Sequence, residues 1–330
     1  MTRFIDDYDC AMFDLDGVVY LGPEPVVGAP ESIADLRQLG VRVGFVTNNA
    51  GRSPEVVVAH LNGLGIECHQ EDVVTSAQAI AQLMARELPS GAKVLVCGAQ
   101  ALVDEVTAVG FTPVGDFTEA PDAVVQGYDP QMTFPRLEDA AFAIQRGARW
   151  YASNTDINRP TNLGISPGAG AQIAAVQVCV DVEPIVAGKP YPPLLQETIK
   201  RMRAVRPVFV GDRLDTDIEG ANNVDIDSFL VFTGAHGKRD LASAIPQQRP
   251  TAIGHDLRGL LRPRREAVWQ QETVVCRGAT ARAVADQVVV SGPLGELSEQ
   301  LDALWAIVQL TWRSPELDAA TALATLDKLP

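Results

Sequence analysis

The sequence predicts an α/β protein. We expect a doubly wound parallel core, an inserted α/β segment, and a small β/α appendage at the carboxyl end. Short apolar runs alternate with helical patterns from residue 10 to about residue 261, which is typical of parallel strands joined by crossover helices. The pattern changes after the basic run Arg262-Pro263-Arg264-Arg265, where β-rich runs precede one long amphipathic stretch.

The first part of the chain reads as strand, helix, strand, helix. The apolar run 11–13 predicts a short buried strand. The range 30–40 predicts a helix, because proline opens it, glycine closes it, and apolar residues recur at helical spacing. A second strand over 41–46 and a second helix over 53–65 follow, so this part predicts the start of a parallel sheet.

The middle of the chain predicts an insertion. A helix over 76–88 ends at Pro89-Ser90-Gly91, and a new α/β run starts at Lys93. Its expected elements are a strand at 93–98, a helix at 99–109, a strand at 123–128, a helix at 136–146, a strand at 150–153 and a helix at 171–179. A loop rich in proline and glycine is expected over 158–170. We expect residues 79–184 to form a separate α/β cap domain.

The core pattern resumes after residue 184. The expected elements are a helix at 192–203, a strand at 208–212, a helix at 215–222, a strand at 228–233 and a strand–helix unit at 251–261. Residues 1–78 and 185–262 would then form the core domain, and residues 263–330 the appendage. In the appendage we expect β-rich runs at 273–276 and 287–290 and an amphipathic helix over 294–312, whose apolar face would serve packing.

Composition and charge exclude some classes of function. The 330 residues are 46% hydrophobic and 21% charged, as in ordinary globular proteins, and the length predicts two or three domains. A net charge of −15 argues against binding to nucleic acid or to an anionic membrane. There is no membrane-spanning apolar run and no signal-peptide core, and five scattered cysteines without a CxxC pair favour a reducing cytoplasm.

Two aspartates follow the first predicted strand, in Asp14-Leu15-Asp16-Gly17. Residues two apart on an extended chain point the same way, and close carboxylates repel unless a cation or proton lies between them. A calcium-binding loop is disfavoured, because glycine stands at position 4 rather than 6 and Pro25 occupies the position of the usual glutamate. This stretch alone therefore predicts either a solvated turn or part of a metal site.

Three later positions supply the other parts of a phosphoryl-transfer site. Thr47 ends a predicted strand and offers a hydroxyl and a backbone N–H to a phosphate oxygen. Lys189, in Gly188-Lys189-Pro190, offers a positive charge from a stiff turn. Asp212 ends another strand and is followed by Asp215 and Asp217, and clustered carboxylates are what Mg²⁺ prefers.

These residue types can hydrolyse a phosphate ester. One carboxylate can attack phosphorus and form an aspartyl phosphate, while Mg²⁺ offsets the charge between the two anions. The second carboxylate, Asp16, can protonate the leaving alcohol and later deprotonate the attacking water. Asp14 is the expected attacker, because it comes first off the strand.

The order of these motifs resembles the haloacid-dehalogenase-superfamily phosphatases. Within them it is similar to the subgroup that carries an α/β cap between the second and third motifs and includes pyridoxal, phosphoglycolate and ribonucleotide phosphatases. The resemblance implies Asp14 as nucleophile and Asp16 as general acid/base. It implies Mg²⁺ on Asp14, the Asp16 backbone carbonyl and Asp212, with Asp217 supporting. The residues implied to bind phosphate are Thr47, Asn48, Asn49 and Lys189.

The resemblance also implies a small phosphorylated alcohol as substrate, with glycerol 3-phosphate expected first. Phosphoglycolate, pyridoxal phosphate and nucleoside monophosphates are the alternatives. A closing cap would exclude bulky or polymeric phosphates. A role of the appendage in assembly, as a homodimer, is an alternative of another class.

Several residues stay open between two interpretations. Asn154, Asp156 and Arg159 lie in the expected cap loop and either meet the substrate or are solvated. Asp215 is either a further metal ligand or a carboxylate at the start of a helix. The run Gly168-Ala169-Gly170 lacks the last glycine of a dinucleotide motif and has no leading strand, so we expect a helix start there.

Overall fold

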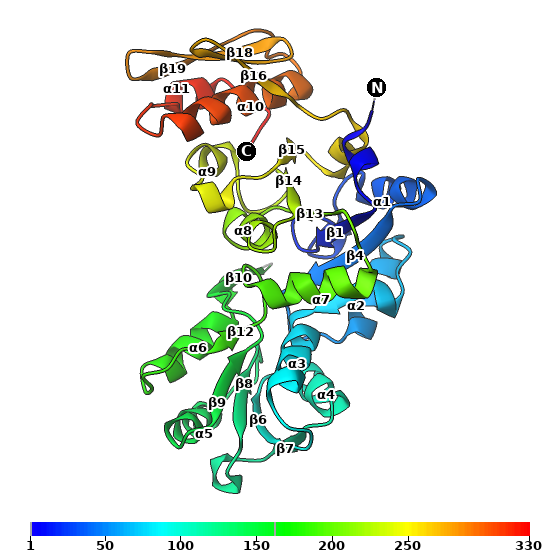
Figure 1. Ribbon diagram of the computed structural model, residues 1–330, viewed down its shortest axis with the longest axis vertical. Helices are drawn as coiled ribbons and strands as arrows, with labels where there is room; N and C mark the ends of the chain where they lie inside the picture. Colours follow the sequence, from blue (N-terminus) through cyan, green and yellow to red (C-terminus); the bar gives the residue numbers. More distant parts are fainter. Residues whose placement is uncertain (1, 162) are drawn as a thin grey trace. The chain divides into compact units, whose positions relative to one another are not determined.

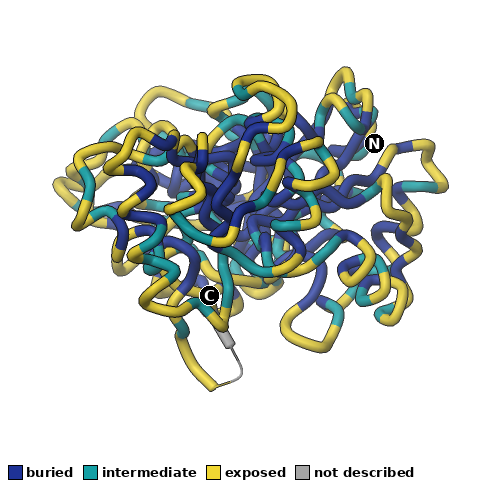
Figure 2. The backbone as a smooth tube through the Cα atoms, turned by 90° about the horizontal axis from the view of Figure 1, so that it is seen from below, coloured by how far each residue is buried: buried dark blue, intermediate teal, exposed yellow. Residues whose placement is uncertain are grey.

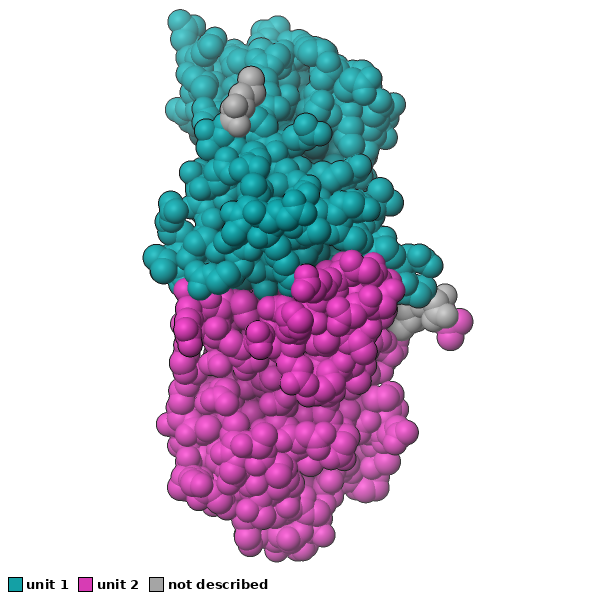
Figure 3. All heavy atoms as spheres, turned by 90° about the vertical axis from the view of Figure 1, so that its right-hand side faces the viewer, with its two compact units in different colours: residues 1–43, 204–330 teal, residues 44–203 magenta. Residues whose placement is uncertain are grey.

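The computed structural model describes residues 2–161 and 163–330, which fall into two compact units (Figure 3). Unit 1 comprises residues 1–43 and 204–330, and unit 2 comprises residues 44–203. Figure 2 colours the backbone by burial, with buried stretches in dark blue and exposed stretches in yellow. Parallel strands alternate with helices along most of the chain, which confirms the α/β class.

Unit 1 contains parallel strands in the order β15-β14-β13-β1 (Figure 1). They span β1 (Cys10–Asp14), β13 (Pro207–Gly211), β14 (Asp227–Val231) and β15 (Ala252–Gly254). Phe13 pairs with Val210, so the carboxyl ends of β1 and β13 lie at the same edge. Both strands are buried almost throughout, which explains their continuous apolar sequence. Asp14 and Asp212 are thereby brought to one sheet edge.

Shorter elements complete this part of unit 1. They are a hairpin of β2 (Tyr20–Leu21) and β3 (Glu24–Pro25), and helices α1 (Ala29–Gln38), α8 (Glu219–Asn222) and α9 (Lys238–Ala242). The prediction of an α-helix over 215–222 is wrong in the first turn. Leu214–Ile218 forms a π-helical turn, and α8 begins only after it. The widened turn lets the Asp217 carboxylate reach back to the backbone N–H groups of Asp212 and Arg213.

The carboxyl end of unit 1 is a four-stranded antiparallel sheet with helix α10 (Leu297–Arg313) on one face (Figure 1). The strands are β16 (Ala267–Gln270), β17 (Thr273–Cys276), β18 (Ala279–Val284) and β19 (Gln287–Ser291), and helix α11 (Ala320–Ala324) follows. The prediction of two β-rich runs was incomplete, because β16 and β18 mix polar and apolar residues without a strong apolar run. Leu304, Ile307 and Val308 are fully buried, so the apolar face of α10 does serve packing.

A buried ion pair joins the linker to α10. The Arg265 Nε and Asp302 Oδ1 atoms lie 2.9 Å apart with both side chains about nine-tenths buried, and Arg277 Nη1 lies 3.4 Å from the same oxygen. The Arg265–Asp302 contact is short but lacks hydrogen-bond geometry, so it acts as an ion pair. Burial raises the pKa of the Asp302 carboxyl even though the two arginines oppose that shift. Each charge therefore depends on the other for compensation.

Replacing Asp302 with alanine should lower the free energy of unfolding by about 3–5 kcal/mol, because the Arg265 guanidinium would stay buried beside Arg277 without its counter-charge. Chemical denaturation measures this change. The matched control is the double variant Arg265→Met with Asp302→Leu, which removes both charges and should cost far less. A loss below about 1 kcal/mol for the single variant would contradict the prediction.

Unit 2 contains two groups of parallel strands. Strand β4 (Arg42–Thr47), most of which lies in unit 2, pairs in parallel with β5 (Val73–Thr75). Three helices pack against β5: α2 (Pro54–Gly63), α3 (Ser76–Glu87) and α7 (Pro192–Met202). A five-stranded parallel sheet has the order β12-β9-β8-β6-β7. Its strands are β6 (Lys93–Cys97), β7 (Thr112–Val114), β8 (Ala123–Gln126), β9 (Arg149–Ala152) and β12 (Ile185–Val186), with helices α4 (Gln100–Ala108), α5 (Phe134–Gln145) and α6 (Ala169–Gln177).

The prediction of a loop over 158–170 is wrong in part. Strands β10 (Asn158–Thr161) and β11 (Gly164–Pro167) form an antiparallel hairpin there, and helix α6 begins at Ala169. Its polar, proline-containing sequence lacks the apolar alternation that marks a half-buried strand. Within the described ranges, helices are too short or too polar to cross a bilayer.

Candidate active site

Strand β1 delivers the first two acidic residues. Asp14 ends the strand and is partly buried, whereas Asp16 is exposed one residue beyond the buried Leu15. Gly17 follows with a φ of +87°, a conformation that glycine adopts without a Cβ penalty. Its N–H donates to the Tyr20 carbonyl at 2.8 Å, which closes a tight turn. Asp14 thus has a fixed position at the sheet edge, and Asp16 faces solvent.

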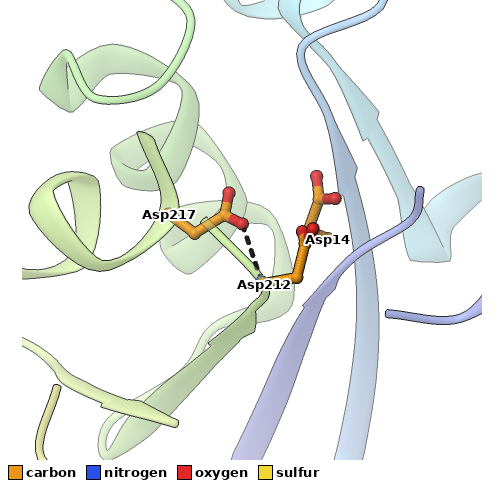
Figure 4. A group of neighbouring side chains, drawn as sticks. All are labelled: Asp14, Asp212 and Asp217. Carbon is orange, nitrogen blue, oxygen red and sulfur yellow. Dashed lines mark hydrogen bonds between the residues drawn. The ribbon is translucent and has the colours of Figure 1, made fainter. Parts of the chain in front are cut away.

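The other two acidic residues follow strand β13. Asp212 and Asp217 are 3% and 1% exposed. One oxygen of Asp217 accepts a hydrogen bond from the Asp212 N–H at 3.1 Å (Figure 4). The same oxygen accepts one from the Arg213 N–H, also at 3.1 Å. Asp217 therefore holds the backbone that carries Asp212.

Glycines make room for the Asp212 carboxylate. A Cβ on Gly234 would lie 2.0 Å from Asp212 Oδ2, and a Cβ on Gly17 would lie 2.5 Å from the same atom. The N–H of Ala235 donates to this oxygen at 2.6 Å. The loop after β14 thus forms a cradle for Asp212. Sequence reasoning missed this loop, although the small residues Thr233-Gly234-Ala235 at the end of an apolar run were the available signal.

Three carboxylates meet at this edge. Oxygen atoms of Asp14, Asp212 and Asp217 lie within 4.8 Å of one another (Figure 4). At about 4 Å and an effective dielectric constant of about 20, each pair of charges repels by about 4 kcal/mol. Hard oxygen ligands on a narrow, partly buried cradle suit a small divalent cation such as Mg²⁺. The described residues therefore fit the metal that the sequence predicted, and Asp16 contributes no side-chain oxygen to this cluster.

Asp215 belongs to a different interaction. Its two oxygens accept hydrogen bonds from Arg213, at 3.1 Å from Nε and 2.7 Å from Nη2. Burial would raise the pKa of this carboxyl, but the hydrogen bonds and charge of Arg213 outweigh burial and lower it. Asp215 was left open between a further metal ligand and a carboxylate at the start of a helix. Its pairing with Arg213 favours the second interpretation.

Unit 2 holds the residues predicted to bind phosphate. Thr47 ends β4 and is 5% exposed, and its Oγ1 accepts a hydrogen bond from the Asn49 N–H at 3.0 Å. Asn49 Oδ1 accepts one from the Gly51 N–H at 2.8 Å. Together these bonds fold residues 47–51 into a closed turn. Lys189 is 2% exposed, and both its backbone N–H and its carbonyl bond the side chain of Asn48.

The three candidate cap residues contact protein groups within unit 2. Asn154 Nδ2 donates to the Asn48 carbonyl at 2.6 Å, and the Asp156 carboxylate lies 3.3 Å from Asn48 Nδ2. Arg159 donates to the Tyr128 hydroxyl at 2.7 Å, and its guanidinium lies 4.6 Å from the centre of that ring. Tyr128 is a residue that sequence reasoning missed, because nothing in the sequence links it to Arg159.

Comparisons with known proteins agree with these features. A family model described as haloacid dehalogenase-like hydrolase matches residues 11–112, and a HAD-hydrolase-like model matches residues 186–260. The chain is 47% identical over 260 residues to D-glycerol 3-phosphate phosphatase of Mycobacterium tuberculosis, covering 79% of this chain and 73% of the relative. It is 36% identical to acid sugar phosphatase of Staphylococcus saprophyticus, covering 78% of this chain and 98% of the relative.

A solved structure extends the similarity to nearly the full length. It is a glycerol phosphate phosphatase from Mycobacterium tuberculosis in complex with magnesium, with a TM-score of 0.90 and 40% identity. The match covers 99% of this chain and 98% of that chain. The similarity therefore includes the carboxyl-terminal sheet and α10 as well as the parallel strands.

Proposed function

The chain belongs to the haloacid dehalogenase-like hydrolases, and on that premise we propose that it is a Mg²⁺-dependent phosphomonoesterase that hydrolyses glycerol 3-phosphate to glycerol and phosphate. The observation that carries the proposal is the cluster of Asp14, Asp212 and Asp217 in a chain similar over almost its full length to a glycerol phosphate phosphatase. Phosphoryl transfer needs a carboxylate nucleophile and charge compensation at one place, and this cluster offers both.

In the proposed reaction a carboxylate oxygen of Asp14 attacks phosphorus. The P–O bond to the alcohol breaks, and Asp16 donates a proton to the leaving oxygen. Asp16 then takes a proton from water, the water oxygen attacks phosphorus, and the aspartyl phosphate breaks to release phosphate and restore Asp14. The exposed position of Asp16 suits a group that exchanges protons with alcohol and water.

The groups that would hold Mg²⁺ are the carboxylates of Asp14 and Asp212 and the backbone carbonyl of Asp16. Asp217 would support this set by holding the backbone at Asp212. When bound, the cation offsets the negative charge on the nucleophile and the phosphate. Asp217 contributes by fixing the Asp212 backbone through its two hydrogen bonds.

Thr47, Lys189 and the turn at Asn48 and Asn49 are proposed to bind the oxygens of the phosphate. A threonine hydroxyl with backbone N–H groups offers neutral donors, and the lysine adds a positive charge. We assign residues 1–78 and 185–262 to the core, residues 79–184 to the cap and residues 263–330 to the appendage. Asn154, Asp156 and Arg159 are proposed as the cap residues nearest the substrate's polar end.

A panel of small phosphomonoesters, assayed with Mg²⁺ and ranked by kcat/KM, tests the substrate. The panel contains glycerol 3-phosphate, 2-phosphoglycolate, pyridoxal phosphate, nucleoside monophosphates and sugar phosphates. We expect glycerol 3-phosphate to rank first by at least about tenfold, which corresponds to about 1.4 kcal/mol of transition-state binding. A higher rank for another ester would reassign the substrate, and no turnover of any ester would contradict the proposed activity.

We propose that the enzyme acts in the cytoplasm, because the sequence has no CxxC pair and four of its five cysteines are buried. We also propose a homodimer formed through the appendage, whose sheet exposes valines at 268, 284 and 289. Combining Val268→Lys with Val289→Lys should then shift the chain from dimer to monomer in light scattering. A monomeric parent chain, or a mass unaffected by these substitutions, would remove the assembly role.

A further inference from the structure

We propose that Asn48 is a positioning residue that fixes Lys189 through its backbone and couples that lysine to the loop after β9. This inference rests on the proposed function, since it takes Lys189 as a group that binds the substrate's phosphate. It assigns the Asn48 side chain to the lysine rather than to the substrate.

The contact between the two residues is two-sided. Asn48 Oδ1 accepts a hydrogen bond from the Lys189 N–H at 2.8 Å, and Asn48 Nδ2 donates to the Lys189 carbonyl at 3.0 Å. One side chain thus satisfies both backbone groups of a residue 141 positions away. Asn48 is 9% exposed and Lys189 is 2% exposed, so breaking either bond would leave a buried polar group unsatisfied. The pair fixes the backbone from which the lysine stem departs.

Asn48 is itself held by three neighbouring side chains. Its carbonyl accepts hydrogen bonds from Ser76 Oγ at the start of α3 and from Asn154 Nδ2. Its Nδ2 also lies 3.3 Å from both carboxylate oxygens of Asp156, and Asn154 Oδ1 accepts from the Asp156 N–H. The Asn48 side chain therefore connects the loop after β9 to the backbone of Lys189.

The turn before the lysine has no room for a side chain. A Cβ on Gly188 would lie 2.7 Å from the Cβ of Asn154 and 2.8 Å from Asn48 Oδ1. The Gly188 N–H also donates to the Ser153 carbonyl at 2.7 Å. The glycine lets the lysine turn approach Asn48 closely enough for both hydrogen bonds, so the arrangement depends on residues from three parts of unit 2.

The proposed role of Asn48 is to keep the positively charged Lys189 ammonium in position for the substrate's phosphate. A lysine ammonium stands on a flexible four-carbon stem, so its position depends on how firmly the backbone is held. A misplacement of about 1 Å in a site that depends on positioning can cost about 100-fold in rate. The Asn48 side chain should therefore influence catalysis chiefly through Lys189.

A double-mutant cycle tests this, using full-length Asn48→Ala, Lys189→Ala and the double variant with glycerol 3-phosphate and Mg²⁺. We expect Asn48→Ala to lower kcat/KM by about 10–100-fold in the parent, and by less than about threefold when Lys189 is already alanine. The inhibition constant of inorganic phosphate should rise in the same pattern. An equal loss in both backgrounds would overturn the proposal, because Asn48 would then act independently of the lysine.

Asn62 provides a matched control. It makes the same two-sided contact with the backbone of Cys68, at 3.1 Å and 3.0 Å, outside the proposed machinery. Asn62→Ala should lower stability but leave kcat/KM and phosphate inhibition near the parent values. If Asn48→Ala does not fold, Asn48→Asp keeps the size and the acceptor, loses the donor toward the Lys189 carbonyl, and enters the same cycle.

The outcomes also separate this inference from the proposed function. If Lys189→Ala leaves kcat/KM and phosphate inhibition unchanged, the assignment of Lys189 to phosphate binding fails, and this inference fails with it. If Lys189→Ala is strongly impaired while Asn48→Ala costs the same with or without the lysine, only the positioning role of Asn48 fails.

Discussion

Asp14→Asn should abolish turnover while the fold is retained. An amide is nearly the same size as the carboxylate but cannot form the aspartyl phosphate, so we expect kcat to fall by about three to six orders of magnitude. The substitution also removes one of three charges that lie within 4.8 Å of one another. Without metal, the unfolding temperature should therefore stay the same or rise, since like-charge repulsion is relieved.

Two measurements check this prediction. Steady-state kinetics with glycerol 3-phosphate give kcat, and mass spectrometry after acid quenching should find phosphate on the peptide that contains Asp14 in the parent enzyme only. Asp215→Asn is the matched control, because that carboxylate pairs with Arg213 outside the cluster. Substantial residual turnover of Asp14→Asn, or trapped phosphate on another residue, would contradict the assignment of the nucleophile.

The sequence predicted Asp14 and Asp212 because each comes directly after a run of apolar residues. Parallel strands place their carboxyl ends at one edge, so the order of strands and acidic residues is enough to bring the two together. The π-helical turn at Leu214–Ile218 could not be predicted in this way. In this turn Asp217 accepts hydrogen bonds from two backbone N–H groups, and helical propensity carries no information about that contact.

The partners of Asn48 were beyond the reach of sequence reasoning for a similar reason. Its contacts with Asn154, Asp156 and Lys189 span 106, 108 and 141 residues, and no local pattern encodes which polar groups meet after folding. Strands β16 and β18 were missed because their stability comes from pairing with β17 and from α10, not from an apolar run of their own. Local sequence thus predicted strand ends well and long-range polar contacts poorly.

Removal of divalent cations should abolish turnover, and Mg²⁺ should restore it. Three carboxylates at one edge repel each other and the substrate's phosphate, so the cation is needed before an anionic nucleophile can approach an anionic ester. We expect EDTA to lower kcat by at least about three orders of magnitude. Independently of activity, saturating Mg²⁺ should stabilise the parent chain by about 2.7 kcal/mol at 100 times its dissociation constant.

Two variants test whether the required Mg²⁺ binds at Asp212. Asp212→Asn removes a ligand charge, and we expect it to weaken Mg²⁺ binding by at least about tenfold, as measured by the thermal shift with added Mg²⁺. Gly234→Ala keeps every carboxylate but brings a Cβ to 2.0 Å from Asp212 Oδ2, so it should also weaken Mg²⁺ binding by displacing that oxygen. Gly63→Ala is the control, because a Cβ there meets nothing within 4 Å.

The pair of variants distinguishes charge from geometry at the same carboxylate. If the cradle matters because it aims Asp212, both substitutions weaken Mg²⁺ binding and the Gly63 control does not. If only Asp212→Asn does so, the charge suffices and the tight approach of Gly234 is a matter of packing alone. Undiminished turnover in EDTA, or a Mg²⁺ response that Asp212→Asn leaves unchanged, would show that the three carboxylates do not hold the metal on which the proposed chemistry depends.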